Sequence, residues 1–133
     1  DNYDLGHCRV LVMDDEEYNR DFICSQIKSA GCSVVAVTNG ADAIKVHQTA
    51  LQDKKPFSVL LLDLTIPGAM GGVDTAIEIR KVDKMATIIA MSGYTTSPVA
   101  NKPQEYSFSA FLAKPFRITE LIALLKKIRP VMV

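Results

Sequence analysis

Short apolar runs alternate with amphipathic stretches along the whole chain, and this pattern constrains the fold more than any other feature. The runs are rich in valine, isoleucine and leucine, and they lie at residues 8–13, 33–38, 57–62, 87–91 and 110–113. Between them, apolar residues recur at helical spacing over residues 16–30, 39–51, 76–82 and 118–128. Such alternation predicts right-handed crossovers and a parallel sheet. We therefore expect a doubly wound α/β fold, with five strands and helices on both faces.

Three helix signals are more specific than this general pattern. Phe22, Ile23 and Ile27 are expected on the buried face of the first helix, and Gly31 is a natural stop after it. Asn39 is of a type that caps helix N-termini and should begin the second helix. The sequence therefore predicts the start or end of two helices as well as their existence.

The length and charge of the chain limit its organisation and its partners. With 133 residues, 48% of them hydrophobic, we expect residues 1–133 to form one domain with its core at about residues 8–129. Fifteen basic and fifteen acidic residues give a formal charge of zero. General attraction to nucleic acid or anionic lipid is therefore not indicated, and we expect direct contact with neither. The three cysteines show no spacing typical of a zinc site or a redox dithiol.

The sequence also bears on location and origin. No uninterrupted apolar run approaches the roughly 20 residues that cross a bilayer, and no charged-then-apolar leader opens the chain. We therefore expect a cytoplasmic domain. The first residue is Asp1 and not methionine, which indicates a segment of something longer.

Polar side chains follow four of the five predicted strands, at the point where each strand ends. Asp14 and Asp15 follow the first strand, Asp63 the third, Ser92 the fourth and Lys114 the fifth. In open parallel sheets, ligands bind beyond these carboxyl ends, because loops converge there. Taken singly, the aspartate pair is more often a helix cap, the serine a turn residue and the lysine a solvated side chain. Their coincidence at one edge of one sheet favours a shared site.

The chemistry of these groups indicates phosphoryl transfer. Three neighbouring carboxylates would raise one another's pKa unless a cation joined them. Oxygen ligands without histidine or cysteine favour magnesium, with manganese as the alternative. Such a cation beside an ammonium and a hydroxyl group suits phosphoryl transfer, which depends on positioning and charge neutralisation. Asp63 stands alone after the most apolar strand, so we predict that it is the nucleophile and that Asp14 and Asp15 bind the metal.

Four motifs resemble those of response-regulator receiver domains. In chain order they are VLVMDDE (10–16), LLLDLTIPG (60–68), AMSGYTT (90–96) and FLAKPF (111–116). The resemblance covers nearly the whole chain, and it alone implies a flavodoxin-like strand order of 2-1-3-4-5. The phrase MSGY, followed by EYSFSAFLAKPF, is similar to receivers attached to hybrid sensor histidine kinases. We expect such a kinase as the source, although the sequence leaves a free-standing receiver open.

The resemblance implies an acceptor and a set of metal ligands. Asp63 would take a phosphoryl group from the phosphohistidine of a histidine kinase or a histidine phosphotransfer domain. Magnesium would be bound by Asp14, Asp15 and Asp63, together with the main-chain carbonyl of Thr65. We expect no stand-alone enzyme, only magnesium-dependent self-phosphorylation and autodephosphorylation.

The resemblance also implies a switch. Ser92 would hydrogen-bond the phosphoryl group and move towards it, and Lys114 would pair with the phosphoryl oxygens. A cis peptide bond before Pro115 would aim that lysine. Phe111 would turn inward into the space that Ser92 vacates, so that the surface of the fourth helix, fifth strand and fifth helix changes.

Three departures from the family pattern lead to further expectations. The loop at residues 68–74, GAMGGVD, is one residue longer than the common loop and lacks its Met-Asp-Gly, so the flap beside the site should be reshaped. Thr65 and Tyr94 occupy the positions that tune acyl-phosphate lifetime, for which the sequence predicts no value. Pro98 and Pro103 both fall in the predicted fourth helix. Pro103 would remove an interior hydrogen bond, so this helix should be short, kinked or displaced.

Two other functions fit part of this pattern. A phosphatase of the haloacid dehalogenase type pairs its nucleophile with a second aspartate two places on, where this chain has Thr65. Release of phosphate from many small esters, beyond one equivalent, would favour that enzyme. An interaction module that has lost phosphorylation would be favoured if acetyl phosphate or beryllofluoride had no effect, although every required side chain is present. His47 has no metal-ligating neighbour in the sequence, and we assign it no role.

Overall fold

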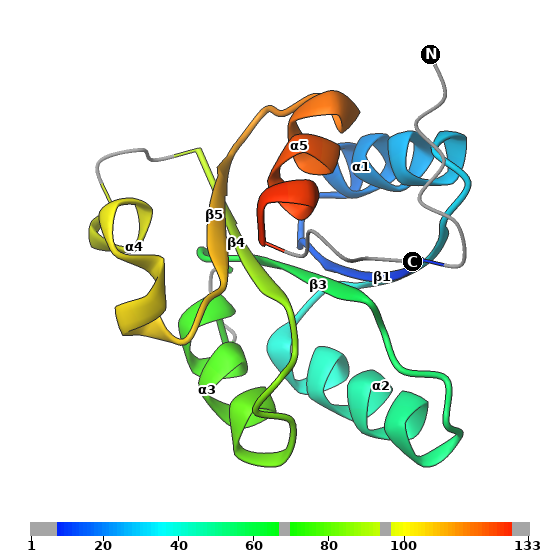
Figure 1. Ribbon diagram of the computed structural model, residues 1–133, viewed down its shortest axis with the longest axis vertical. Helices are drawn as coiled ribbons and strands as arrows, with labels where there is room; N and C mark the ends of the chain where they lie inside the picture. Colours follow the sequence, from blue (N-terminus) through cyan, green and yellow to red (C-terminus); the bar gives the residue numbers. More distant parts are fainter. Residues whose placement is uncertain (1–7, 67–69, 94–96, 129–133) are drawn as a thin grey trace.

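A sheet of five parallel strands forms the centre of the computed structural model, which describes residues 8–66, 70–93 and 97–128 (Figure 1). The strands, in chain order, are β1 Arg9–Met13, β2 Ser33–Val37, β3 Val59–Asp63, β4 Ile88–Ser92 and β5 Ala110–Ala113. They lie in the order β2-β1-β3-β4-β5, and every neighbouring pair is parallel. Both the doubly wound parallel sheet and its flavodoxin-like order are therefore confirmed.

Helices cover both faces of the sheet (Figure 1). They are α1 Glu17–Ser29, α2 Gly40–Gln52, α3 Gly72–Val82, α4 Pro98–Asn101, the 3-10 helix η1 Pro103–Tyr106 and α5 Ile118–Ile128. Side chains of α1 and α5 pack on one face of the sheet, and those of α2 and α3 on the other. Successive residues of β1 therefore enter different cores: Val10 and Val12 face α1 and α5, whereas Leu11 and Met13 face α2 and α3. Within the described residues, no helix is long and apolar enough to cross a membrane.

Local residue chemistry fixes two of the helix ends. The side-chain oxygen of Asn39 accepts a hydrogen bond from the main-chain N–H of Asp42 at 2.9 Å, so the predicted cap of α2 is confirmed. Gly31 follows α1 with a φ of 91°, a left-handed conformation that suits glycine better than other residues. The predicted stop after α1 is confirmed by this conformation.

The fourth helix is broken in two, as its prolines predict. Pro98 lies at the start of α4, where it leaves no intrahelical donor missing, and the Ser97 side chain accepts a hydrogen bond from the Val99 N–H. Lys102 then leaves helical geometry, with φ −136° and ψ 67°. Pro103 begins η1, and its carbonyl accepts a hydrogen bond from the buried Phe108. The short fourth helix is therefore confirmed.

The packing corrects one expectation from the sequence and adds one contact that the sequence did not indicate. Phe22 was expected on the buried face of α1 but is 47% exposed, because this helix contacts the sheet through Ile23 and Ile27. His47 is buried in α2, and its Nε2 lies 3.0 Å from Asp83 Oδ2. The two residues lie 36 positions apart, so no local pattern could reveal the pair.

Candidate functional site

The polar residues that end the strands lie around one cavity at the carboxyl edge of the sheet. This cavity has a volume of about 450 Å³. Its lining contains all five side chains that the sequence brings to this edge, namely Asp14, Asp15, Asp63, Ser92 and Lys114. The described lining also contains Glu16, Asn19, Thr65 and Gly93. The topology of the sheet therefore brings together residues that lie as many as 100 positions apart in the chain.

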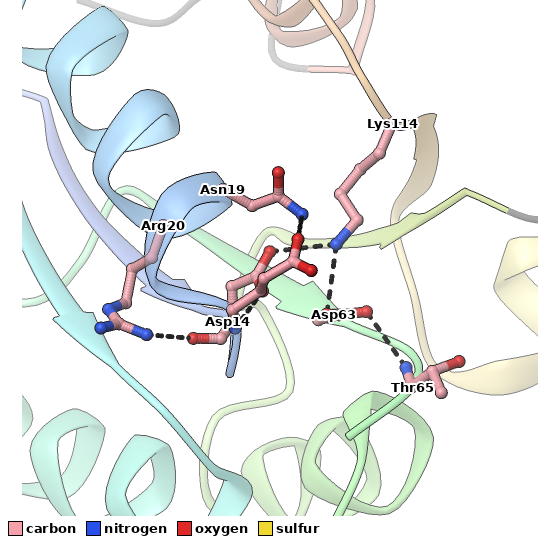
Figure 2. A network of polar contacts seen from close by, with 7 residues as sticks. Asp14, Asn19, Arg20, Asp63, Thr65 and Lys114 are labelled. Carbon is pink, nitrogen blue, oxygen red and sulfur yellow. Dashed lines mark hydrogen bonds and ion pairs between the residues drawn. The ribbon is translucent and has the colours of Figure 1, made fainter. Parts of the chain in front are cut away.

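The ammonium group of Lys114 lies between two carboxylates (Figure 2). Its Nζ is 3.0 Å from Asp14 Oδ2 and 3.2 Å from Asp63 Oδ2. The Asp14 side chain is fully buried, and Asp63 is only 5% exposed. Both carboxylates are therefore held in charge-assisted hydrogen bonds with little access to water.

Burial and pairing act on the pKa of this lysine and of Asp63. Burial raises the pKa of the Asp63 carboxyl above its ordinary value, and this outweighs the Thr65 N–H and the Lys114 charge, which lower it. Burial alone would lower the pKa of Lys114, but the hydrogen bond to Asp14 and the charge of Asp63 raise it overall. Lys114 therefore stays protonated at neutral pH, while Asp63 is in an environment that penalises its negative charge.

The turn between β1 and α1 holds Asp14 on several sides. Its main-chain N–H donates to the Val37 carbonyl at 3.1 Å, and its Oδ1 accepts from the Glu16 N–H at 3.0 Å. The Arg20 guanidinium donates to the Asp14 carbonyl at 2.9 Å (Figure 2). The residue at the N-cap of α1 is Glu16, and no side chain caps the helix there, so neither aspartate of the pair is the N-cap.

The end of β3 fixes Asp63 in a similar way. Its Oδ1 accepts a hydrogen bond from the Thr65 N–H at 3.1 Å, and Leu64 N–H donates to the Met91 carbonyl of β4. Gly72 packs so closely beneath this turn that a Cβ there would lie 2.7 Å from the Asp63 carbonyl oxygen. A Cβ on Gly71 would lie 2.8 Å from the carbonyl oxygen of Leu64. The glycine pair therefore lets α3 approach the backbone of the candidate acceptor, which sequence reasoning missed.

Three carboxylates provide a place for a hard cation. One oxygen each of Asp14, Asp15 and Asp63 lies within 4.8 Å of the other two, and no other such group of three occurs among the described residues. Asp15 is exposed while the other two are buried, so one side of the cluster is open to water. An all-oxygen donor set with room for water fits magnesium, which gives up its hydration shell reluctantly.

The remaining predicted residues lie along β4 and β5. Ser92 ends β4 and is buried, and its carbonyl accepts a hydrogen bond from the Lys114 N–H at 2.8 Å. The peptide bond between Lys114 and Pro115 is cis. Phe111 is partly buried in β5, where it packs against the core on the α2 and α3 side. The main-chain hydrogen bond therefore links Ser92 to Lys114, and Phe111 lies in the strand that directly precedes Lys114.

Two expectations concern positions that the structure leaves undescribed. Gly68, in the first part of the predicted flap, and Tyr94, at a lifetime-tuning position, lie outside the described residues. The described part of the flap, from Met70 onward, includes the Gly40 N–H to Met70 carbonyl hydrogen bond at 3.2 Å. This bond joins the flap to the start of α2.

Comparison with known proteins places these features in a family. The profile of the response regulator receiver domain matches residues 10–126. The chemotaxis protein CheY of Thermotoga maritima is 29% identical over 121 residues, which cover 90% of this chain and 96% of CheY. Putative NtrX-like response regulators are longer: the Rickettsia typhi protein is 29% identical over 92% of this chain, which spans only 25% of its length.

Solved structures agree with this assignment. A mutant receiver domain of the Arabidopsis thaliana histidine kinase CKI1 matches with a TM-score of 0.82 and 28% identity, over 92% of this chain and 89% of that one. The Thermotoga maritima response regulator TrrA, solved in complex with Mg²⁺ and BeF, matches with a TM-score of 0.74 and 28% identity. That match covers 91% of this chain and 98% of TrrA. The chain therefore belongs to the response regulator receiver domains and is a phosphoacceptor receiver of two-component signalling.

Proposed function

We propose that Asp63 is the residue that accepts the phosphoryl group. The observation that carries the proposal is the Lys114 ammonium, which lies within hydrogen-bonding distance of both Asp14 and Asp63 inside one cavity. Asp63 lies at the end of the central strand, and its Oδ1 is held by the Thr65 N–H. A carboxylate fixed in this way can act as a nucleophile, because its position needs no adjustment during the reaction.

The metal in this proposal is magnesium, with manganese as the alternative. Asp14, Asp15 and Asp63 supply the clustered carboxylate oxygens, and the main-chain carbonyl of Thr65 is the expected further ligand. When bound, the cation neutralises negative charge on the oxygens of the transferred group. The magnesium in the related TrrA structure supports this choice.

Lys114 and Ser92 respond to the new group in our proposal. The phosphoryl oxygens replace part of the negative charge that Lys114 now meets on Asp14 and Asp63, so the ammonium pairs with them. Ser92 donates its hydroxyl to the same group and moves towards it. The inward turn of Phe111 then changes the surface of α4, β5 and α5. The main-chain bond between Lys114 and Ser92 supports coupled movement of these two residues.

The donor in this proposal is the phosphohistidine of a histidine kinase or a histidine phosphotransfer domain. A hybrid histidine kinase is the proposed source of the chain, supported by its similarity to the receiver domain of the histidine kinase CKI1. We further propose that residues 1–133 act as one cytoplasmic domain, without direct contact to nucleic acid or membrane. The zero formal charge supports the last point.

Phosphorylation with acetyl phosphate and Mg²⁺ tests the acceptor. We expect the intact mass of the wild type to increase by one phosphoryl group and that of Asp63→Asn to stay unchanged. Asp74→Asn is a matched control, since Asp74 is an exposed aspartate in the first turn of α3. Labelling of Asp63→Asn at the wild-type rate would overturn the proposal.

A further inference from the structure

The described lining of the cavity carries one more negative charge than positive charge when the proposed site is occupied by its metal. Asp14, Asp15 and Asp63 carry three negative charges, and a divalent cation together with Lys114 carries three positive ones. Lys114 is the only cationic side chain in the described lining of this cavity. The lining also contains the exposed Glu16, whose carboxylate adds a fourth negative charge.

Asn19 holds this extra carboxylate in place. Its Nδ2 donates a hydrogen bond to Glu16 Oε1, one turn earlier in the chain. The main-chain N–H of Glu16 is itself bound to Asp14 Oδ1 at 3.0 Å, so the residue is anchored at the edge of the charged pocket. A side chain held at both its main chain and its carboxylate keeps its charge at the cavity that Asp63 also lines.

We propose that Glu16, held by Asn19, is a specificity-determining residue that disfavours small, highly charged phosphodonors. This inference rests on the proposed function, because it concerns the same acceptor and metal. A free dianion such as acetyl phosphate must approach the mouth without compensation for the Glu16 charge. A phosphohistidine on a protein carries its own surrounding residues, which can supply a positive or neutral contact to Glu16. The charge therefore selects for donors that arrive as part of a protein surface.

The reaction that reports on this charge is simple. A carboxylate oxygen of Asp63 forms a bond to the phosphorus of acetyl phosphate, the bond from phosphorus to the acetyl oxygen breaks, and acetate leaves with the electron pair. Because the donor is a dianion, removal of one negative charge at a separation of about 8 Å in water should raise the rate of phosphorylation by about five-fold. Salt at about 0.5 M should reduce this factor below about two-fold.

The experiment compares Glu16→Gln with Glu17→Gln, which makes the same charge change one residue away. Glu17 is exposed and, within the described residues, is not part of the cavity lining. At saturating Mg²⁺ and low ionic strength, we expect Glu16→Gln to be phosphorylated by acetyl phosphate about five-fold faster than the wild type, and Glu17→Gln no more than about three-fold faster. Phosphoramidate has a smaller net charge than acetyl phosphate, so Glu16→Gln should raise the rate of phosphorylation by phosphoramidate less.

A second readout separates charge from shape and does not depend on phosphorylation. A negative charge that repels a dianion attracts a cation, so Glu16→Gln should weaken Mg²⁺ binding by about the same factor. Titration of Mg²⁺ followed by the amide signal of Thr65 measures this affinity. Faster phosphorylation together with tighter Mg²⁺ binding would overturn the electrostatic account.

Asn19 is tested by its dependence on Glu16. Asn19→Ala frees the Glu16 carboxylate to move outward. Introduced into the wild type, it should raise the phosphorylation rate by about two-fold, and introduced into Glu16→Gln, it should leave the rate unchanged. Equal rates for Glu16→Gln and Glu17→Gln, in a protein labelled only on Asp63, would refute this inference while the proposed function stands. Labelling that does not need Asp63 would instead refute the proposed function.

Discussion

The two sides of the proposed phosphorylation site differ in how firmly the structure holds them. On the β1 and β3 side, α1, α2 and α3 are regular helices of 11 to 13 residues, and the turns that carry Asp14 and Asp63 have hydrogen bonds from several directions. On the β4 and β5 side, α4 has only 4 residues, and a 3-10 turn replaces the rest of the helix. The turns that position charge are thus well supported, and within the surface proposed to change on activation α4 is supported less.

A single side chain provides much of the support on the weaker side. The Arg80 guanidinium, from α3, donates to the Ser107 carbonyl at 3.1 Å and to the Ser109 hydroxyl at 3.2 Å. It also donates to the carbonyls of Lys84 and Ala86, before β4. Arg80 therefore joins the end of α3 to the segment between η1 and β5.

The largest effect is expected from crowding the well-supported side. Gly72→Ala places a Cβ 2.7 Å from the Asp63 carbonyl oxygen, so the backbone of the proposed acceptor must shift. We expect the free energy of unfolding to fall by about 2 kcal/mol, and phosphorylation to slow. Gly93→Ala is the control, since a Cβ there meets nothing within 4 Å. Urea denaturation measures both variants, and equal stability would show that this side tolerates more movement than the hydrogen bonds suggest.

The next effect comes from removing the support of the weaker side. Arg80→Met loses several hydrogen bonds from a charged donor, and we expect it to destabilise the domain by about 1.5 kcal/mol. Lys81→Met is the control, because Lys81 forms only an exposed ion pair with Glu78. Hydrogen exchange should accelerate for the amides of Ser107 and Phe108 but not for those of β1. Acceleration spread evenly over the sheet would contradict the proposed difference between the two sides.

The smallest effect should come from repairing the broken helix. Pro103→Ala restores an N–H donor and allows α4 to continue past Lys102, with a change in stability of less than about 1 kcal/mol. Cα chemical shifts of residues 102–106 should move towards helical values. Pro98→Ala, at the start of α4, should leave these shifts unchanged. If Pro103→Ala also leaves them unchanged, tertiary packing of η1 and not the proline causes the break.

The sequence predicts the fold well where short-range rules decide the outcome. Strands and helices follow from apolar periodicity, and Asn39, Gly31 and the prolines of the fourth helix act within a few residues of their own positions. The convergence of the strand-end side chains also follows, because parallel strands end at one edge. The exposure of Phe22 and the pairing of His47 do not follow, since both depend on which part of each helix meets the rest of the protein.

The parts of the site that sequence reasoning missed depend on tertiary approach. Glu16 and Asn19 read as ordinary residues at the start of a helix, and only the direction of α1 brings them to the cavity. The need for glycine at position 72 arises from the Asp63 carbonyl, nine positions earlier in the chain, and becomes visible only once α3 is packed beneath it. In the sequence, the pair Gly71-Gly72 was the one signal that could have indicated this close approach.

The separation of the two cores by the sheet has an evolutionary consequence. Glu16 and Asn19 lie at the start of α1, whose side chains pack in one core, whereas Val99 of α4 and Phe111 of β5 pack in the other. Substitutions in one layer are therefore expected to combine additively with substitutions in the other. The start of α1 and the α4 part of the proposed output surface can then diverge independently, whereas α5 shares a core with α1 and is expected to change together with it.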